Sequence, residues 1–471
     1  MHRPRLAFAS LLLASSLALA ASVGWMYAAP QESPTPAPAA DQPLGAAGDG
    51  RTDDTAALEK QLSRGRLYLP RGVYRITRTL EVPLSQMGPV EIRGAAGAKL
   101  VMAAAGPAVR ITGGHAGTAD PASAAPETWE RERFPLIAGF EITGAHPEAD
   151  GIEAAGTMQL TIDNMLIRQV RHGIRLHDRN RNVLIADSHI YDNRGVGIWL
   201  DRVNLHQTNI GNCHISYNRK GGIVVRGGEV RNIHITGCDI EGNMSPDAPP
   251  TANVLFDCAE GSVAEAAITG CTIQHDSKSP DSANVRILGR GRMLRRGEPL
   301  AFQCGHVTIA DNVLSDVRIN LDLQGVRGAT VSGNTLWQGY DANLRIIDCQ
   351  QLVLSGNLLE RNPLYGYTTE ASNSIVIQKC QDVTLQGLHV QGVLDAEAGV
   401  LLEDCSRIHM HGCTILDCDR AGLKLRNVRR SAIHDNVVRD DRMDAGERKP
   451  AIVLEGDNAE TQVADNSTNS P

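Results

Sequence analysis

The chain has 471 residues and a formal net charge of −8 at pH 7. This acidic balance excludes a general nucleic-acid-binding protein, which must neutralise phosphates, although it still allows a locally basic groove. Charged residues make up 21% of the chain and hydrophobic residues 42%, which excludes a disordered polymer.

The first predicted element is an export signal over residues 1–29. It begins with positive charge, continues as an apolar uncharged run, and contains "ALA" at 18–20, an A-x-A type cleavage site. We therefore expect a secreted or periplasmic protein. An uncleaved segment that anchors the chain in the cell membrane is the alternative, because the apolar run is long. A Pro/Ala-rich linker is predicted over residues 30–47.

Residues 48–104 are predicted to form an N-terminal cap and the first strands. Asp53 or Thr52 can cap a helix over about 54–64 that has one apolar face. The stretch "RLYLPRGVYRI" (66–76) then predicts two strands around a Pro-Arg-Gly turn. A helix here would cover the open end of a sheet and protect its edge.

Two repeated patterns run through residues 105–466. The first places a small polar residue or Cys after Gly or Asp, between apolar positions, with most spacings at 22 to 25 residues. The small position falls on Ser188, Cys213, Cys238, Cys271, Asn312, Asn334, Asn357, Leu388, Cys413, Asn436 and Asn466. The second pattern alternates apolar and other residues over about five positions, as in "GIWLDR" (197–202), which is the period of a half-buried strand.

Each repeat predicts one rung of three short strands joined by tight turns, and rungs stack about 4.8 Å apart. We therefore predict an all-β fold, a right-handed single-stranded parallel β-helix (solenoid) of about 12–13 rungs. A tail is predicted over residues 467–471.

The small positions predict an inward ladder, in which side-chain amides bond the turn backbone of the next rung. A similar column is predicted for Cys258, Cys349, Cys380 and Cys405. Eight of the ten cysteines are thus interpreted as small core residues. A disulfide between stacked neighbours such as Cys213 and Cys238 is the alternative.

The segment "GDGRTDDTAALEKQL" (48–62) followed by "GRLYLPRGVYRI" (65–76) resembles the N-terminal segment of the pectate-lyase-like right-handed β-helix superfamily, which includes polygalacturonases. The later rungs resemble its generic β-helix region. The resemblance implies polysaccharide lysis, hydrolysis or uronate epimerisation outside the cytoplasm, and it extends to phage tailspikes and to proteins without known catalysis. The ordered catalytic segments of polygalacturonases and the Asp-Pro-His-Asp motif of alginate epimerases are missing from this sequence.

The alternating strand predicts which side chains point outward, to the solvent side. One outward column reads His177, Asp201, Arg226 and Asp257 on four successive rungs, and these residues are predicted to be catalytic. A neighbouring column supplies the predicted substrate-binding residues, which are Glu153, Arg175, Trp199 and, farther along the coil, Arg286. The loops before these strands add Arg171, His172, Asn193, Arg194, Asn218, Arg219 and Lys220.

These residue types suit a uronic-acid polymer. Arg pairs with carboxylates through a planar fork, and Trp199 offers a flat apolar face to a sugar ring. His177 with a neighbouring Arg or Lys can serve proton transfer at C5. Hydrolysis needs two carboxyls, and Asp201 and Asp257 are expected about 9.6 Å apart. A solvated ladder of alternating charges is the competing interpretation.

We therefore expect an exported carbohydrate-active protein that acts on an acidic, uronate-containing polysaccharide as a lyase, an epimerase or a glycoside hydrolase. A non-catalytic cell-envelope or adhesion scaffold that binds glycans or proteins is the alternative. No cofactor is expected. Asp and Glu groups could collect Ca²⁺, but no motif indicates it. The expected partner is an anionic polysaccharide and not nucleic acid. A membrane is a partner only if the N-terminal segment is retained. An oligomer is an alternative to a monomer, because no C-terminal cap is evident and another chain could cover the last rung.

Overall fold

The computed structural model describes residues 45–117, 120–291, 303–361, 370–442 and 449–469. The predicted export signal and most of the predicted linker lie outside these residues. No helix within the described ranges is long and apolar enough to span a bilayer. The described residues belong to one unit, Leu44–Pro471.

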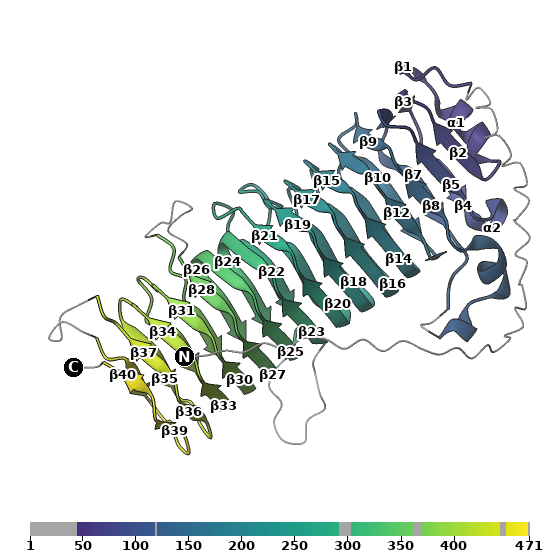
Figure 1. Ribbon diagram of the computed structural model, residues 1–471. Coiled ribbons are helices and arrows are strands. Elements are labelled where there is room, and N and C mark those ends of the chain that lie inside the picture. The colour runs from purple at the N-terminus through teal and green to yellow at the C-terminus, as the bar shows by residue number, and fades with distance from the viewer. Residues whose placement is uncertain (1–44, 118–119, 292–302, 362–369, 443–448, 470–471) are drawn as a thin grey trace, which may run out of the picture. The chain divides into compact units, whose positions relative to one another are not determined.

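Parallel strands build this unit, and they stack in three columns that together form a coil (Figure 1). The first column contains β4 (Leu80–Pro83), β7 (Gly106–Thr112), β10 (Ala149–Ala155), β14 (Ile174–Ala186), β16 (Ile198–Gly211), β18 (Ile223–Thr236), β20 (Ala252–Thr269), β22 (Ala283–Leu288), β24 (Val313–Gln324), β26 (Thr335–Ile347), β29 (Ile375–Gln378), β32 (Ala398–Glu403), β35 (Ala421–Arg426) and β38 (Ile452–Glu455).

The second column takes the later halves of β14, β16, β18 and β20. Its other strands are β2 (Arg66–Leu69), β5 (Glu91–Gly94), β8 (Leu136–Ala138), β12 (Thr161–Asp163), β23 (Cys304–Ala310), β25 (Arg327–Ser332), β27 (Gln350–Ser355), β30 (Gln381–Gln386), β33 (Ser406–His411), β36 (Ala432–His434) and β39 (Gln462–Ala464). The short β11 (Thr157–Met158) pairs with the middle of β14.

The third column takes the first residues of β24 and β26. Its other strands are β1 (Asp49–Asp53), β3 (Gly72–Ile76), β6 (Ala98–Met102), β9 (Glu141–Gly144), β13 (Leu166–Arg168), β15 (His189–Tyr191), β17 (His214–Ser216), β19 (Asp239–Glu241), β21 (Thr272–Gln274), β28 (Leu358–Glu360), β31 (His389–Gln391), β34 (Thr414–Leu416), β37 (Val437–Arg439) and β40 (Ser467–Thr468). Because β40 pairs with β37, the third column extends into residues 467–468, within the stretch predicted as a tail.

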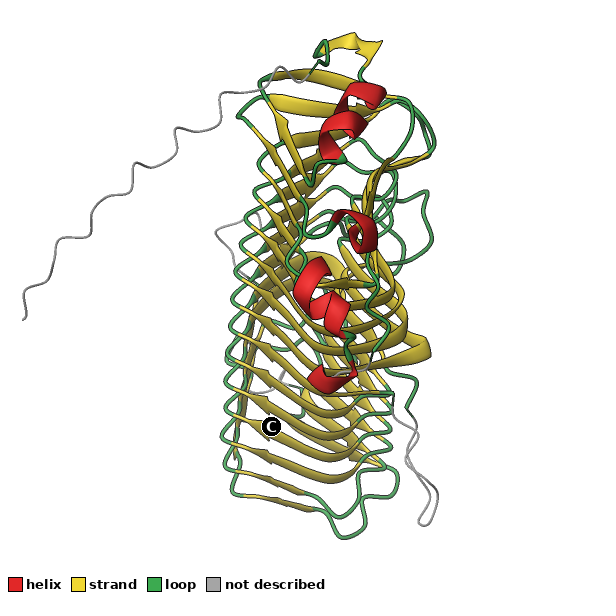
Figure 2. Cartoon of the chain, turned by 90° about the vertical axis from the view of Figure 1, so that its right-hand side faces the viewer, coloured by secondary structure: helices red, strands yellow, loops and turns green. Residues whose placement is uncertain are grey.

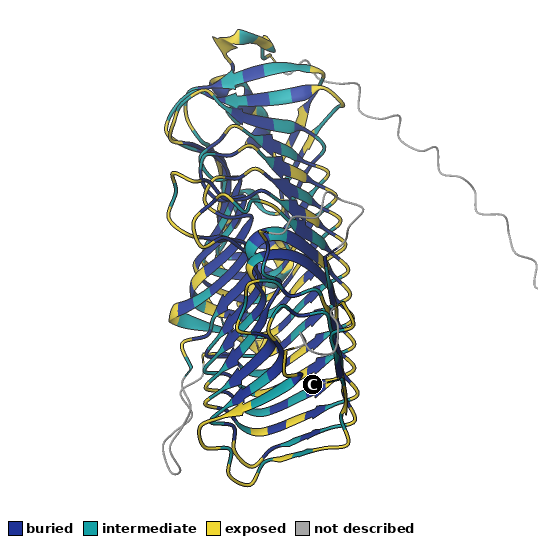
Figure 3. Ribbon diagram, turned by 90° about the vertical axis from the view of Figure 1, so that its left-hand side faces the viewer, coloured by how far each residue is buried: buried dark blue, intermediate teal, exposed yellow. Residues whose placement is uncertain are grey.

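The core consists of apolar side chains stacked at equivalent positions of successive rungs. Ile152, Ile174 and Ile198 are register partners, and each is at most 1% exposed. Figure 3 shows the resulting alternation of buried and exposed residues along the strands. Burial of this apolar area, worth roughly 25 cal/mol per Å², is the main force that holds one rung on the next.

The predicted polar ladder is confirmed. The backbone N–H of Cys271 donates to Asn312 Oδ1 at 2.9 Å, and Asn312 and Asn334 donate in the same way to the next Asn at 3.0 Å each. All ten cysteines are buried and none forms a disulfide, so their interpretation as core residues holds.

A second buried amide ladder was not predicted. It consists of Asn193, Asn218, Asn243, Asn253, Asn284, Asn320 and Asn343. The sequence placed Asn193 and Asn218 in loops beside the site, but both are at most 1% exposed and bond the backbone of neighbouring rungs. They are therefore structural residues.

Helix α1 (Thr55–Leu62) confirms the predicted cap. Leu58 and Leu62 are buried against the first strands. The N-cap position is Asp54, whereas the Asp53 carboxylate accepts from the Thr55 N–H at 3.1 Å. The other helical turns are α2 (Leu84–Met87), η1 (Pro121–Ser123) and η2 (Thr128–Glu132). Figure 2 shows the helices on the outside of the coil.

Candidate functional site

The predicted order of the outward columns is confirmed by the strand register. His177 pairs with Asp201, Asp201 with Arg226, and Arg226 with Asp257. In the neighbouring column Glu153 pairs with Arg175 and Arg175 with Trp199, and Arg286 follows two rungs after Val224. The structure thus brings the predicted residues together on the first column of strands.

The expectation that these side chains face solvent is wrong for three of them. Glu153, Asp201 and Arg286 are only 8%, 3% and 5% exposed. Alternation fixes the side of the sheet to which a residue points, but long side chains from neighbouring rungs lie over it. The apolar outward residues Val224 and Leu255 are buried in the same way, in a small cluster outside the main core.

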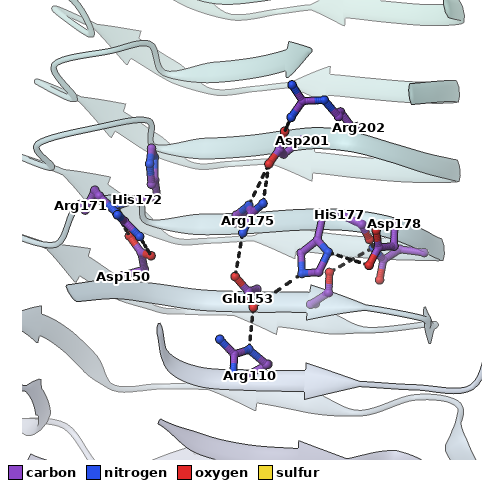
Figure 4. A network of polar contacts seen from close by, with 12 residues as sticks. Arg110, Asp150, Glu153, Arg171, His172, Arg175, His177, Asp178, Asp201 and Arg202 are labelled. Carbon is purple, nitrogen blue, oxygen red and sulfur yellow. Dashed lines mark hydrogen bonds and ion pairs between the residues drawn. The ribbon is translucent and has the colours of Figure 1, made fainter. Parts of the chain in front are cut away.

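The buried carboxylates belong to a chain of ion pairs that crosses successive rungs (Figure 4). Glu153 accepts from Arg110 at 2.6 Å and from Arg175 at 3.0 Å. Asp201 accepts from Arg175 at 2.6 Å and from Arg202 at 3.2 Å. We call Arg110, Glu153, Arg175, Asp201 and Arg202 the ion-pair chain. Its two carboxylates are already neutralised by the protein.

His177 joins this chain through Glu153. Its Nε2 lies 3.6 Å from Glu153 Oε1, and its Nδ1 lies 3.0 Å from Asp178 Oδ2. The contact with the Glu153 carboxylate raises the pKa of His177, and the same contact, with Arg110, lowers the pKa of Glu153 to about 2. The imidazole therefore favours its protonated form, which suits a proton donor better than the base expected from the sequence.

Asp201 and Asp257 are poorly placed for hydrolysis. Asp257 pairs with Arg290 at 2.9 Å and with Arg226 at 3.7 Å, and Asp201 is held by the ion-pair chain. A hydrolytic pair must face the glycosidic bond, whereas both of these carboxylates are already occupied by guanidinium groups of the protein.

Arg286 is also committed to ion pairs. Its guanidinium contacts Asp322 at 2.7 Å and Asp281 at 3.0 Å. Because Arg286 is almost fully buried beneath these partners, it does not present its fork to a ligand on the surface.

Trp199 is half-buried and does not form an open platform. The His172 ring packs against it with a centroid distance of 4.6 Å, and the Arg175 guanidinium lies 5.2 Å from its ring centroid. The indole also packs on the outer apolar cluster. Its faces are thus used by cation–π and aromatic contacts within the protein.

A different group of Arg and His side chains lies where β14 bends between the first and second columns. Asp178 and Asn182 adopt positive φ angles of 54° and 53° around this bend. Arg179 Nε donates to Nε2 of His115, from the loop after β7, at 3.3 Å. Arg181 follows on β14 and is the register partner of His206 on β16. We call Arg179, Arg181, His115 and His206 the bend cluster.

The bend cluster has buried nitrogen atoms that lack partners. Among the described residues, Arg179 Nη2, His115 Nδ1 and His206 Nδ1 are buried without a hydrogen bond, and Arg179 forms no ion pair. Burial, together with the charges of Arg179 and Arg181, lowers the pKa of His115 to about 4 and lowers the pKa of His206. Such an arrangement disfavours further positive charge and favours an anion.

A groove of about 550 Å³ continues from the bend cluster over the second column. Its lining is Phe134, Gln159, Thr161, Asn182, Val183, Leu184, Gln207, Asn209, Asn232 and His234. Phe134 is 63% exposed and Leu184 42%. Arg181 connects the two features, because its Nε donates to Asn182 Oδ1 at 3.0 Å. The groove combines apolar surface with side-chain amides that both donate and accept hydrogen bonds.

The sequence contained a signal for part of this surface. "HDRNR" (177–181) places two arginines directly after an alternating stretch, at the point where a strand must turn. His115 gave no such signal, because it reaches Arg179 from 64 positions away along the chain.

Comparison with known proteins confirms the fold. The family described as "Right handed beta helix region" matches residues 135–273. No curated protein sequence matches the chain. The chain is thus a right-handed parallel β-helix, as the repeats predicted.

Solved structures resemble the chain at low sequence identity. Pre-mature bacteriophage phi29 gene product 12 aligns with a TM-score of 0.54 and 13% identity, over 91% of this chain and 55% of that one, so the chain spans about half of that protein. The A-module of the mannuronan C-5 epimerase AlgE4 of Azotobacter vinelandii gives 0.40 and 16%, over 91% and 98%. The Dettilon tailspike protein gives 0.47 and 16%, over 88% and 67%. These likenesses concern the fold.

Proposed function

We propose that the protein binds an acidic, uronate-containing polysaccharide on the outer surface of β14 and β16. The bend cluster holds a sugar carboxylate, and the groove beside it holds the sugar rings. The observation that carries the proposal is Arg179, a half-buried residue whose Nη2 atom is buried without a hydrogen bond and which has no carboxylate partner among the described residues. It lies beside two ring nitrogens that also lack partners.

A carboxylate complements this site better than a neutral group. It presents two acceptor oxygens, and Arg179 Nη2 is a donor directed by its fixed guanidinium plane. His115 Nε2 accepts from Arg179, so the ring proton lies on the unpartnered Nδ1, which is a second donor. A charge-assisted hydrogen bond in such a buried position is about twice as strong as a neutral one.

The proposal moves the binding site away from the column chosen from the sequence. There, Glu153, Asp201 and Asp257 already have guanidinium partners on neighbouring rungs. A uronate approaching that face would have to displace these carboxylates. At the bend cluster a ligand carboxylate would supply the missing acceptor.

Among the activities considered from the sequence, lysis or epimerisation fits this surface better than hydrolysis. Both reactions begin when a base removes the C5 proton, and a donor then protonates the leaving oxygen in lysis or C5 in epimerisation. His177, with its raised pKa, lies on β14 two residues before Arg179 and suits that donor role. Export and catalytic turnover are further predictions of this proposal, and a scaffold that binds glycan without turnover shares the same binding site.

Isothermal titration calorimetry with defined oligosaccharides tests the proposal. Oligouronides from alginate and pectate are expected to bind, and neutral gluco-oligosaccharides of equal length to bind at least tenfold more weakly. Arg179→Gln is expected to weaken oligouronide binding at least tenfold, which corresponds to about 1.4 kcal/mol. The matched control is Arg226→Gln, an exposed Arg of the first column, which should leave affinity unchanged. Equal binding of neutral sugars, or a loss with Arg226→Gln alone, would contradict the proposal.

A further inference from the structure

Three potential metal-binding side chains meet on the third column of strands, where Figure 1 shows β17 and β19 side by side in teal. They are His214 on β17 and Asp239 and Glu241 on β19, and one ligand atom of each lies within 4.8 Å of the others. The register places His214 directly beside Asp239, and Glu241 two residues further along the same strand. This site is separate from the proposed glycan surface.

The charge of this group is unbalanced. Among the described residues, Asp239 forms an ion pair only with His214, with 3.8 Å between Asp239 Oδ2 and His214 Nε2, and Glu241 forms none. Carboxylates elsewhere on the coil, such as Asp201, are instead matched by Arg. Two neighbouring carboxylates with one imidazole therefore lack a counter-charge that a divalent cation would supply.

A second observation points to a ligand at the same place. Ser216 is the register partner of Glu241, and its side chain is fully buried. Its Oγ has no hydrogen-bond partner among the described residues. A buried hydroxyl without a partner costs about 1–3 kcal/mol, and a water on a metal held by Glu241 would satisfy it.

Neighbouring side chains also orient Glu241 and His214. Tyr217 OH donates to Glu241 Oε1 at 3.0 Å, and Gln274 Nε2 donates to Oε2 at 3.3 Å, which fixes the carboxylate plane. His189 Nδ1 lies 3.5 Å from His214 Nδ1. With the proton of His214 on Nδ1, its Nε2 lone pair faces Asp239, as in metal sites whose second imidazole nitrogen is hydrogen-bonded.

We propose that His214, Asp239 and Glu241 bind a divalent transition-metal ion of the Zn²⁺ type. Ligands at about 2.0–2.1 Å in a tetrahedral site lie about 3.4 Å apart, close to the 3.8 Å between His214 Nε2 and Asp239 Oδ2. The imidazole selects this class over Ca²⁺, which takes oxygen ligands. Three protein ligands leave a fourth position for water.

Calorimetric titration of the purified chain with Zn²⁺ alone, in a buffer that does not chelate metals, tests this site. His214→Gln and Asp239→Asn are each expected to weaken Zn²⁺ binding at least tenfold. The matched control is His434→Gln, because His434 belongs to another group of close imidazoles on the coil, with His409 and His411. Loss of Zn²⁺ binding in the control and not in His214→Gln would overturn the proposal, and so would tighter binding of Ca²⁺ than of Zn²⁺.

A second measurement does not depend on the folding of any variant. Crystals of the unaltered chain soaked in Zn²⁺ are expected to show anomalous scattering between His214 and Asp239. Absence of a peak there would also overturn the assignment. Because neither experiment involves a glycan, failure of the metal site leaves the proposed glycan function unaffected.

Discussion

At the level of single residues, outward charged side chains are found in two arrangements. In the ion-pair chain a buried carboxylate always meets guanidinium groups of neighbouring rungs, as Asp201 does with Arg175. In the bend cluster the buried Nη2 of Arg179, beside His115, has no such partner among the described residues. The first arrangement is complete within the protein and structural, whereas we propose that an anionic ligand completes the second.

Asp201→Asn is expected to destabilise the fold without weakening glycan binding. The change removes the negative charge between Arg175 and Arg202, and one third of the Arg175 side chain is exposed, so water offsets part of the loss. We expect the free energy of unfolding to fall by about 2 kcal/mol in denaturant titrations. A variant of unaltered stability that no longer binds oligouronide would place the glycan site on the first column instead.

Binding of an oligouronide is expected to strengthen as the pH falls from 7 to 5. Burial, Arg179 and Arg181 hold the pKa of His115 at about 4 in the free protein. A bound carboxylate raises that pKa, so the complex takes up protons and the affinity rises as the pH falls towards the free value. Calorimetry at several pH values measures the slope, and His115→Gln should reduce it. A slope that is the same in both proteins would contradict the assignment.

The same depressed pKa has the opposite effect on the stability of the free protein. The unfolded chain binds a proton at His115 near the ordinary value of 6.5, whereas the folded chain does so only near 4. The contribution of His115 to stability is therefore present above pH 6.5 and declines as the pH falls between these values.

At the scale of elements, the amide ladders define the turns. In the first ladder an Asn oxygen accepts the backbone N–H of the preceding rung and its N–H₂ donates to a carbonyl. Asn334, for example, accepts from the Asn312 N–H and donates to Ile309 O, at 3.0 Å each. A buried backbone group left without its partner is costly, which explains why all the ladder positions except Leu388 hold Asn, Ser or Cys.

Asn334→Ala is therefore expected to lower the free energy of unfolding by about 1–3 kcal/mol, because the Asn312 N–H and the Ile309 carbonyl lose their partner. Denaturant unfolding followed by circular dichroism measures the change. Asn209→Ala, an exposed amide of the groove, is the matched control and should change stability by less than about 0.5 kcal/mol. Equal effects of the two substitutions would show that the ladder is not a stabilising element.

The geometry of the strands also explains which features of the fold could be predicted from the sequence. The period of two and the repeat spacing determine the strands, their register and the inward or outward side of each residue, so the pairing of His177 with Asp201 followed from the sequence. Exposure did not follow, because it depends on how far Arg175 reaches over Asp201 from the previous rung. The bend cluster was missed because His115 reaches Arg179 through the fold and not through local spacing.

At the scale of the whole molecule, stability comes from stacking of rungs and not from covalent links. The core runs from the strands beneath α1 to the last rungs of the coil, and the cysteines belong to it as small apolar residues. In such a coil each rung contacts mainly its neighbours, so the free energy of folding is distributed along the chain.

A reductant is accordingly expected to leave the melting temperature unchanged within about 1 °C, because no disulfide constrains the unfolded chain. Alkylation of the denatured, unreduced protein followed by mass spectrometry should find all ten cysteines modified. A lower melting temperature in reductant, or a pair of unmodified cysteines, would show a bridge.

The central claim, that acidic glycan binds at the bend of β14 and not on the first column, is tested most directly by a crystal structure of the chain with a bound oligouronide. Sugar rings are expected in the groove between Phe134 and Leu184, with a carboxylate within hydrogen-bond distance of Arg179 Nη2. A ligand seated instead over Trp199 and Asp201 would contradict it.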